Sequence, residues 1–328
     1  TGKLTLPSGI TKIEDYVFYR CSGLSGELTI PDGVTSIGDY AFASSNFSGD
    51  LYIPSSVTSI GKSAFYFSGI TGELIISGSL TTIENSTFAN CSFTAVELPD
   101  SITNIEEKAF LSCNYLYSIT IPHGVVSIGD AAFYGCKNLT NLTIETGVKR
   151  IGDHAFYECD NLSGELVIPD SVEEICDYAF AYCSGFTGDL IIPNSVVSVG
   201  GYAFENCSGF SGRVDISNKI TTIQEYTFSM CSGLSGEIVI PDGVTKIGEF
   251  AFYSCDSFTD KMVIPDSVKS VKKHAFSCWQ ITNVYYTGDI ASWCGIDGIE
   301  FIIQNGKNND GQYNIRKLYI NGQELTGD

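Results

Sequence analysis

The chain has 328 residues, of which 38 are acidic and 18 are lysine or arginine, so its formal net charge at pH 7 is −20. This charge repels the phosphates of nucleic acids and of anionic membranes, and we expect neither as a partner. No apolar run approaches the roughly 20 residues that a transmembrane helix needs, which argues against membrane insertion of this segment.

One short pattern recurs along most of the chain. A unit of 22 to 24 residues cannot bury its own apolar face, so neighbouring units must stack around a continuous core. The sequence therefore predicts a solenoid, whose coils we number from a recurring phenylalanine taken as position zero. This phenylalanine occurs twelve times, at Phe18, Phe42, Phe65, Phe88, Phe110, Phe133, Phe156, Phe180, Phe204, Phe228, Phe252 and Phe276.

Each coil begins with a predicted strand. Positions −14 and −12 are apolar, as in Leu166 and Ile168, and the residue between them faces the opposite side. All nine prolines lie at −11, where a residue without a backbone donor ends a ladder. From −5 onward the apolar spacing is helical, which predicts a short helical turn. We expect that turn to be capped by aspartates at −3, namely Asp15, Asp39, Asp130, Asp153 and Asp177.

A ladder of cysteines is predicted along the core. Stacked residues lie about 4.8 Å apart, further than the ~3.8 Å Cβ separation of a disulfide, and no Cys-x-x-Cys pair suggests a metal site. We therefore expect reduced, buried thiols that donate to a turn carbonyl, with Ser45 and Ser68 doing the same; paired disulfides are the alternative. Nine of the twelve cysteines lie at +3: Cys21, Cys91, Cys113, Cys136, Cys159, Cys183, Cys207, Cys231 and Cys255.

The pattern decays after Phe276. Residues 284–286 are predicted to form a thirteenth strand, residues 289–296 a short helix, residues 304–314 a polar loop, and Asn321-Gly322 the turn of a hairpin. Trp279 and Trp293 are expected to cover the last coil. We assign residues 1–281 to the solenoid and 282–328 to a C-terminal capping segment. Residues 1–7 and 325–328 each copy part of a repeat, so we expect further sequence on both sides.

The repeated pattern Leu-x-Ile-Pro-x-x-Val-x-x-Ile-Gly-x-x-Ala-Phe-x-x-Cys, over residues 3 to 286, resembles the BspA-like, or Treponema pallidum-type, leucine-rich repeats. The resemblance implies an α/β solenoid: a right-handed curved superhelix with a parallel sheet on its concave side, short helical turns elsewhere and a C-terminal cap. It also implies a bacterial cell-surface or secreted protein used for adhesion and protein binding. Because one fold serves many ligands, the partner must be sought on exposed rows of residues.

The histidines suggest no catalytic constellation. His154 and His274 share position −2 but lie five coils apart, about 24 Å, and His123 follows a strand-ending proline. No histidine is placed beside a nucleophilic serine or thiol, and adjacent carboxylates such as Glu173 and Glu174 are typical of a solvated surface. We expect a protein that is not an enzyme and that uses no cofactor and no metal.

Two exposed rows could bind a partner. The row at −13 is apolar in the second half of the chain, which indicates a protein-binding surface; the β-propensity of branched residues is the competing explanation. Candidate protein-binding residues are Tyr52, Ile75, Val167, Ile191, Val239 and Val263, with Glu165, Asp189 and Glu237 as a polar rim. Rings at −2 are expected to pack between coils, with carbohydrate stacking as the alternative: Tyr16, Tyr40, Tyr178, Tyr202, Tyr226 and Phe250.

The expected function is therefore protein–protein interaction or adhesion through the concave face, with a host or matrix protein as the partner. A structural spacer within a larger surface protein and a glycan-binding adhesin are the alternatives.

Overall fold

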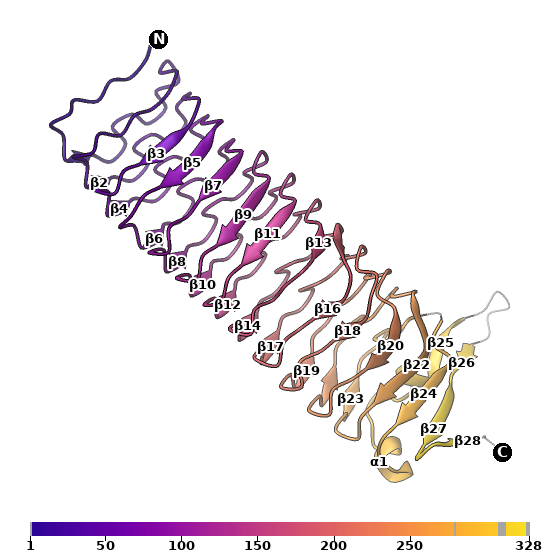
Figure 1. Ribbon diagram of the computed structural model, residues 1–328. Coiled ribbons are helices and arrows are strands. Elements are labelled where there is room, and N and C mark those ends of the chain that lie inside the picture. Colours follow the sequence, from indigo (N-terminus) through magenta and orange to yellow (C-terminus); the bar gives the residue numbers. More distant parts are fainter. Residues whose placement is uncertain (1, 279, 308–312, 326–328) are drawn as a thin grey trace. The chain divides into compact units, whose positions relative to one another are not determined.

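The structure, a computed structural model, describes residues 2–278, 280–307 and 313–325. It consists of two compact units, Thr1–Leu162 and Ser163–Asp328. Both are parallel-strand β-solenoids built from the same coil, with about twelve turns in all and few helices (Figure 1). Each coil contributes a two-residue strand at −6 and −5, and we call the short parallel sheets of these strands the second sheet. From Leu51 onward the coils also have strands between −18 and −12, and we call the short parallel sheets of these strands the first sheet.

In the first unit, neighbouring strands run parallel with equivalent positions opposite each other, as in the pairing of Tyr52 with Ile75. The first-sheet strands are β3 (Leu51–Ile53), β5 (Glu73–Ile76), β7 (Ala95–Glu97), β9 (Ser118–Ile121) and β11 (Asn141–Ile144). The second-sheet strands are β1 (Lys12–Ile13), β2 (Ser36–Ile37), β4 (Ser59–Ile60), β6 (Thr82–Ile83), β8 (Asn104–Ile105), β10 (Ser127–Ile128) and β12 (Arg150–Ile151).

The second unit repeats this arrangement. On the first-sheet side, β13 (Gly164–Glu165) pairs with β15 (Phe186–Thr187), β16 (Leu190–Ile191) with β18 (Val214–Asp215), and β20 (Gly236–Val239) with β22 (Phe258–Ile264). The second-sheet strands are β14 (Glu174–Ile175), β17 (Ser198–Val199), β19 (Thr222–Ile223), β21 (Lys246–Ile247) and β23 (Ser270–Val271).

The predicted core is confirmed. Leu51 and Ile53 are buried on either side of the exposed Tyr52, because successive strand residues face opposite sides. The phenylalanines at zero form a file of stacked rings in each unit. Ring centroids lie 5.2 to 5.5 Å apart from Phe18 to Phe156 and 5.1 to 5.9 Å apart from Phe180 to Phe276. They therefore mark successive rungs within each unit.

The segment around each phenylalanine is a succession of turns, which corrects the prediction of a helical turn there. Residues at −2 and +2 have positive φ, as in Tyr16 (58°) and Arg20 (55°), so the chain cannot continue as a helix. Backbone donors alternate: the Tyr19 N–H donates to the Tyr16 carbonyl of its own coil, whereas the Phe18 N–H donates to the Ala41 carbonyl of the next coil. The turns thus leave alternate backbone N–H groups free to bond with the next coil, whereas an α-helix would use these groups for its own hydrogen bonds.

Four of the aspartates predicted to cap their own turn accept a backbone N–H of the next coil: Asp15, Asp39, Asp130 and Asp177. Asp15 Oδ1 accepts the N–H of Asp39 at 2.9 Å, and Asp39 Oδ1 accepts the N–H of Lys62 at 2.8 Å. Gly38 makes room for this contact, since a Cβ there would lie 2.2 Å from Asp15 Oδ1 and 2.6 Å from its backbone nitrogen. The repeated Gly at −4 is therefore a consequence of coil stacking.

Two further rungs follow Phe276. The predicted thirteenth strand is present as β24 (Asn283–Tyr286), which pairs parallel with β22, and β27 (Lys317–Ile320) pairs parallel with β24. β28 (Gln323–Leu325) then returns antiparallel through Asn321 and Gly322, both with positive φ, which confirms the hairpin.

Between these rungs lie α1 (Ile290–Cys294), which begins after its N-cap Asp289, and α2 (Glu300–Ile303). In the described part of the chain, neither these nor any other helix is long and apolar enough to span a bilayer. The predicted polar loop at 304–314 contains the antiparallel pair β25 (Gln304–Lys307) and β26 (Tyr313–Ile315). Trp293 is buried edge-on against Tyr286, with centroids 5.0 Å apart, as its covering role requires. Trp279 and residues 326–328 lie outside the described residues.

A buried arginine that the sequence analysis did not identify closes the last coil. The Arg316 guanidinium donates to the carbonyls of Phe276, Cys278, Ile281 and Ile302 at 2.6 to 3.0 Å. In earlier coils the phenylalanine carbonyl accepts a thiol from the following coil, and at Phe276 the guanidinium takes that place. Burial lowers the pKa of Arg316 to about 10, so the group is charged at neutral pH.

Candidate functional site

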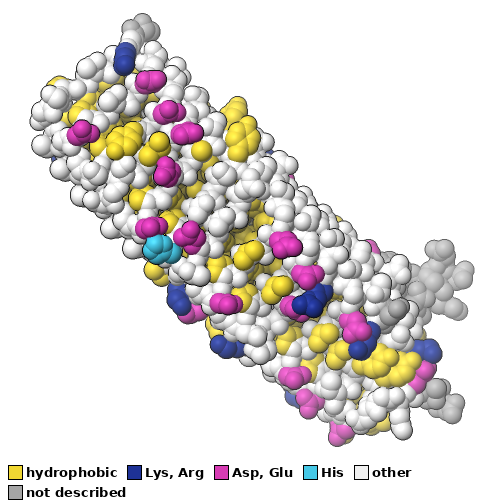
Figure 2. Space-filling model, viewed as in Figure 1, with side chains coloured by type: hydrophobic (Ala, Val, Ile, Leu, Met, Phe, Trp, Pro, Cys, Tyr) yellow, Lys and Arg dark blue, Asp and Glu magenta, His cyan; other side chains and the backbone are white. Residues whose placement is uncertain are grey.

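In each unit, the outward side chains of the first sheet form a surface that we call the strand face of that unit. Tyr52, Val167, Ile191 and Val239 expose 49%, 68%, 47% and 50% of their surface there. Ile75 on the strand face of the first unit and Val263 on that of the second are half-buried, each paired with an exposed neighbour at −13. Figure 2 shows apolar side chains gathered over the first-sheet strands, with acidic and basic groups beside them.

A first groove, of about 260 Å³, lies along β13 and β16 in the second unit. Val167 and Ile191 line it, and the three carboxylates Glu165, Asp170 and Asp189 stand around them. Its other lining residues are Leu166, Ile168 and Pro193. Four of the nine residues predicted to bind protein therefore line one groove, while Asp170 was missed by the sequence analysis.

A second groove in this unit, of about 500 Å³, contains Glu237 and Val239. Val263 faces Val239 across the β20–β22 pairing, and the Lys261 ammonium lies 3.0 Å from the Glu237 carboxylate. The remaining lining residues are Arg213, Val214, Asp215, Ile216, Gly236 and Pro241. The predicted residues Glu237 and Val239 thus share this groove with a charged pair, Arg213 and Asp215, that was not predicted.

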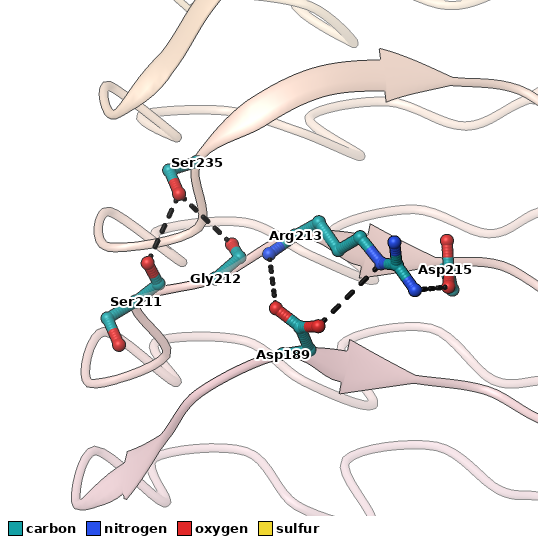
Figure 3. A network of polar contacts seen from close by, with 6 residues as sticks. All are labelled: Asp189, Ser211, Gly212, Arg213, Asp215 and Ser235. Atoms are coloured by element: carbon teal, nitrogen blue, oxygen red, sulfur yellow. Dashed lines mark hydrogen bonds and ion pairs between the residues drawn. The ribbon is translucent and has the colours of Figure 1, made fainter.

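Arg213 links the edges of the two grooves (Figure 3). Its backbone N–H donates to Asp189 Oδ1 at 2.9 Å, and its side chain lies 3.7 Å from Asp189 Oδ2 and 3.0 Å from Asp215 Oδ2. Gly212 permits this approach, because a Cβ there would lie 1.9 Å from Asp189 Oδ1. Ser235 fixes the adjacent corner by donating to the Ser211 carbonyl at 3.1 Å. Asp189 is therefore held by the next coil, and Asp215 interrupts the apolar row.

The strand face of the first unit has a smaller hollow, of about 190 Å³, beside Tyr52. Glu27 and Asp50 contribute carboxylates to it, and Asp50 Oδ1 accepts the N–H of Glu73 at 2.9 Å. The remaining lining residues are Leu28, Thr29 and Ile30. Of the candidate binding residues on this unit, Tyr52 lines the hollow, whereas Ile75 does not.

The rings at −2 pack against each other between neighbouring coils, as predicted. Centroid separations are 5.0 Å for Tyr16–Tyr40 and 4.4, 4.5 and 4.7 Å along the series Tyr178, Tyr202, Tyr226 and Phe250. Desolvation, with the nearby Glu225 carboxylate, raises the pKa of Tyr202 to about 12. Since neighbouring rings cover these faces, a sugar could stack on few of them.

Most of the ladder thiols are buried and donate to a backbone carbonyl, as predicted. Cys91 Sγ donates to the Phe65 carbonyl at 3.1 Å, and Cys231 Sγ to the Phe204 carbonyl at 3.0 Å, in each case in the preceding coil. Burial raises the pKa of Cys91 to about 11 and that of Cys231 to about 12. Such thiols are poor nucleophiles and poor metal ligands at neutral pH because the thiolate is the reactive form.

Three potential metal ligands converge on the first unit, although the sequence analysis predicted no metal site. The His123 Nδ1 lies 3.4 Å from Asp100 Oδ1 and 3.7 Å from Glu145 Oε2. Asp100 and His123 share position −10 in successive coils, and Glu145 occupies −11 in the next coil, where most coils have proline. Aligning the coils by position would have placed these side chains at one corner.

Comparisons with known proteins agree with this architecture. Residues 1–117, 81–211 and 210–293 match the family model described as the BspA type leucine rich repeat region. No curated protein matches the chain.

Three solved bacterial structures are similar. A leucine rich cell surface protein of Faecalibacterium prausnitzii A2-165 is 30% identical, with a TM-score of 0.55 over 89% of this chain and 80% of that chain. A leucine-rich repeat protein of Bacteroides ovatus ATCC 8483 is 27% identical, with a TM-score of 0.64 over 88% of this chain and 66% of that chain. One from Eubacterium ventriosum ATCC 27560 shares the fold at 22% identity and a TM-score of 0.54, over 93% and 85% of the two chains. Because the family model matches most of its length, the chain belongs to the BspA-type leucine-rich repeat family.

Proposed function

We propose that this chain is a non-catalytic cell-surface or secreted protein that binds another protein through the strand face of its second unit. The observation that carries the proposal is the pair of neighbouring grooves, each containing an exposed branched side chain and carboxylates. Exposed apolar patches with polar surroundings are characteristic of protein interaction sites. The F. prausnitzii relative, described as a cell surface protein, supports the proposed location.

The grooves favour binding over β-propensity alone. Propensity explains why Val167, Ile191 and Val239 suit a strand, but it does not explain the hollows that they line. A partner side chain that enters a hollow loses more water-accessible apolar surface than one resting on a flat sheet. Because each Å² of buried apolar surface contributes about 25 cal/mol, contacts inside the hollows should contribute more to affinity than contacts on the flat parts of the sheet.

The charges around the grooves indicate the chemistry of the partner. In the described part of the chain, Glu165 and Asp170 have no ion-pair partner, whereas Asp189 and Glu237 already face Arg213 and Lys261. The first groove therefore presents uncompensated negative charge beside Val167 and Ile191 in a chain of net charge −20. We propose a partner segment with apolar side chains flanked by lysine or arginine, whose association slows as salt rises.

Affinity capture with charged variants tests this function. The double variant Ile191→Lys/Val239→Lys places an ammonium in each groove, while Val197→Lys is the matched control, because Val197 is 54% exposed in the same unit beside the second sheet. Each protein is immobilised and exposed to host-cell and extracellular-matrix extracts, and retained proteins are quantified by mass spectrometry. Circular dichroism melting verifies that all three proteins are folded.

The proposal expects at least one protein that is retained by the wild type and by Val197→Lys and is reduced about tenfold or more by the double variant. Equal recovery on all three proteins would remove the strand-face claim. A complete lack of retained protein would favour the structural spacer. The glycan-binding alternative is tested by a glycan array, on which the proposal expects no signal above that of a denatured sample.

A further inference from the structure

We infer that Asp100, His123 and Glu145 bind a divalent transition-metal ion on the first unit. The set offers one imidazole nitrogen and two carboxylate oxygens from three successive coils, all within 4.8 Å of one another. Imidazole favours zinc and its first-row neighbours over calcium and magnesium, which prefer oxygen ligands alone. The donor set therefore selects an ion of the zinc type.

The spacing of the donors fits tetrahedral coordination. Zinc binds histidine nitrogen and carboxylate oxygen at about 2.0 to 2.2 Å, which places two ligand atoms of a tetrahedron about 3.4 Å apart. The two distances from His123 Nδ1, 3.4 Å to Asp100 Oδ1 and 3.7 Å to Glu145 Oε2, are close to that edge length. Because all three donor atoms lie within 4.8 Å of one another, side-chain rotation can bring them onto one ion, with water as the fourth ligand.

The charge of the cluster also calls for a cation. In the described part of the chain, no lysine or arginine forms an ion pair with Asp100 or Glu145, so two carboxylates lie close together beside His123. A divalent ion neutralises both. The side chains of Asp100, His123 and Glu145 are 69%, 60% and 43% exposed, so an ion can enter from solvent.

The backbone holds Glu145 in place before any ion binds. Glu145 Oε2 accepts the His123 N–H at 3.0 Å, and the Glu145 N–H donates to the Ile121 carbonyl at 3.0 Å. The second bond is impossible for the proline found at this position in nine coils. Gly147 allows the two coils to approach, since a Cβ there would lie 2.1 Å from the His123 carbonyl oxygen. An ion at this corner would join three coils.

Calorimetric titration with Zn²⁺ tests the site. The parent protein carries Cys294→Ser, because Cys294 is an exposed thiol that would bind zinc on its own. His123→Ala and Glu145→Gln remove ligands, and His154→Ala is the control, since His154 packs against Tyr157 in the same unit. We expect one Zn²⁺ per chain in the parent and the control. In both ligand variants, the affinity for Zn²⁺ should fall by about tenfold or more. Magnesium in excess should not compete.

Cobalt absorption gives a second readout that does not depend on heat. Co²⁺ bound to nitrogen and oxygen ligands should show visible d–d bands without the intense thiolate charge-transfer band. A thiolate band, equal Zn²⁺ affinities for His123→Ala and His154→Ala, or no binding at millimolar Zn²⁺ would each overturn the inference. All substituted ligands are exposed, so these variants should fold like the parent.

Discussion

One thiol in most coils links that coil to the one before it. The Sγ donors at Cys113, Cys136 and Cys159 lie 3.2 Å from the phenylalanine carbonyls of the preceding coils, deep in the core. In one of the two coils with serine at this position, the Ser45 hydroxyl donates to the carbonyl of its own Phe42. The thiol is a second donor to each of these carbonyls, which also accept the backbone N–H of the cysteine in their own coil, as Phe110 does from Cys113.

The thiols make stability sensitive to alkaline pH. Burial raises the folded-state pKa of Cys91 to about 11 and of Cys231 to about 12, from an ordinary value of 9.0 that returns on unfolding. A raised folded pKa contributes stability that is fully present below the unfolded pKa and is lost as the pH rises toward the folded value, at about 1.4 kcal/mol per thiol per pH unit. Melting temperatures should therefore fall above pH 9.

Cys231→Ser provides the comparison, because serine does not titrate and the same position holds serine in other coils. Between pH 9 and pH 10, the free energy of unfolding should fall less steeply with pH in the variant than in the wild type. The difference in slope should correspond to about one proton fewer released on unfolding. Parallel curves for the two proteins would mean that the buried thiols do not carry the alkaline loss.

Gly38, at −4, lies closely against the preceding coil. A Cβ on Gly38 would lie 2.6 Å from the backbone nitrogen of Asp15, an atom that cannot move alone, whereas a Cβ on Gly9 would meet nothing within 4 Å. Gly38→Ala should destabilise the protein by about 1 to 3 kcal/mol through overpacking, and Gly9→Ala should be neutral or slightly stabilising. Denaturant unfolding of both variants checks this, and a harmless Gly38→Ala would contradict the close approach.

At the scale of the element, the hydrogen-bond partners of the turns explain where the sequence was informative. Alternation at −14 and −12, the strand-ending prolines and Asn321-Gly322 act on the local backbone directly. The hairpin was confirmed, and so was the strand in most coils, whereas residues 4–6, 28–30 and 166–168 form no strand. The helical spacing around Phe18 was misleading, because stacked turns bury the same positions as a helix would. The difference lies in the carbonyl that accepts the backbone N–H, as the Ala41 carbonyl does for Phe18. This carbonyl belongs to the next coil, so the sequence of a single coil does not reveal it.

The candidate site was predictable to the extent that it follows a single row. Position −13 placed Val167, Ile191 and Val239 on one face. Arg213 was missed because it stands at −15 and reaches Asp189 across coils, and the cluster at His123 was missed for the same reason. Arg316 occurs once, outside the repeats, so no periodicity could indicate its burial.

The last rungs depend on Arg316. Arg316→Met would leave the carbonyls of Phe276, Cys278, Ile281 and Ile302 without this donor, at a cost of about 1 to 3 kcal/mol for each group left buried and unsatisfied. Hydrogen exchange of β24 and β27 should accelerate, while β3 and β5 in the other unit stay unchanged. Lys317→Met is the control, because the Lys317 side chain forms an exposed ion pair with Glu324. Equal protection in the two variants would show that the guanidinium is dispensable.

At the scale of the molecule, stacking of the coils buries many side chains in the core and leaves rows of outward side chains exposed. The Phe file and the thiol ladder are mostly buried and hold coils to one another, whereas the stacked tyrosines also pack between coils but keep part of their surface exposed. The strand face of the second unit is different, since Val167, Ile191 and Val239 remain exposed in or beside grooves. We therefore propose that this face binds the protein partner.

Site-specific photo-crosslinking tests this assignment most directly. Benzoylphenylalanine replaces Ile191 in one protein and Val197 in another, two positions of similar exposure in the same unit. Each protein is irradiated in the extract that contains its captured partner, and crosslinked products are identified by mass spectrometry. The account predicts a product with the partner from position 191 and none from position 197. A product from position 197 alone, or equal products from both, would contradict it.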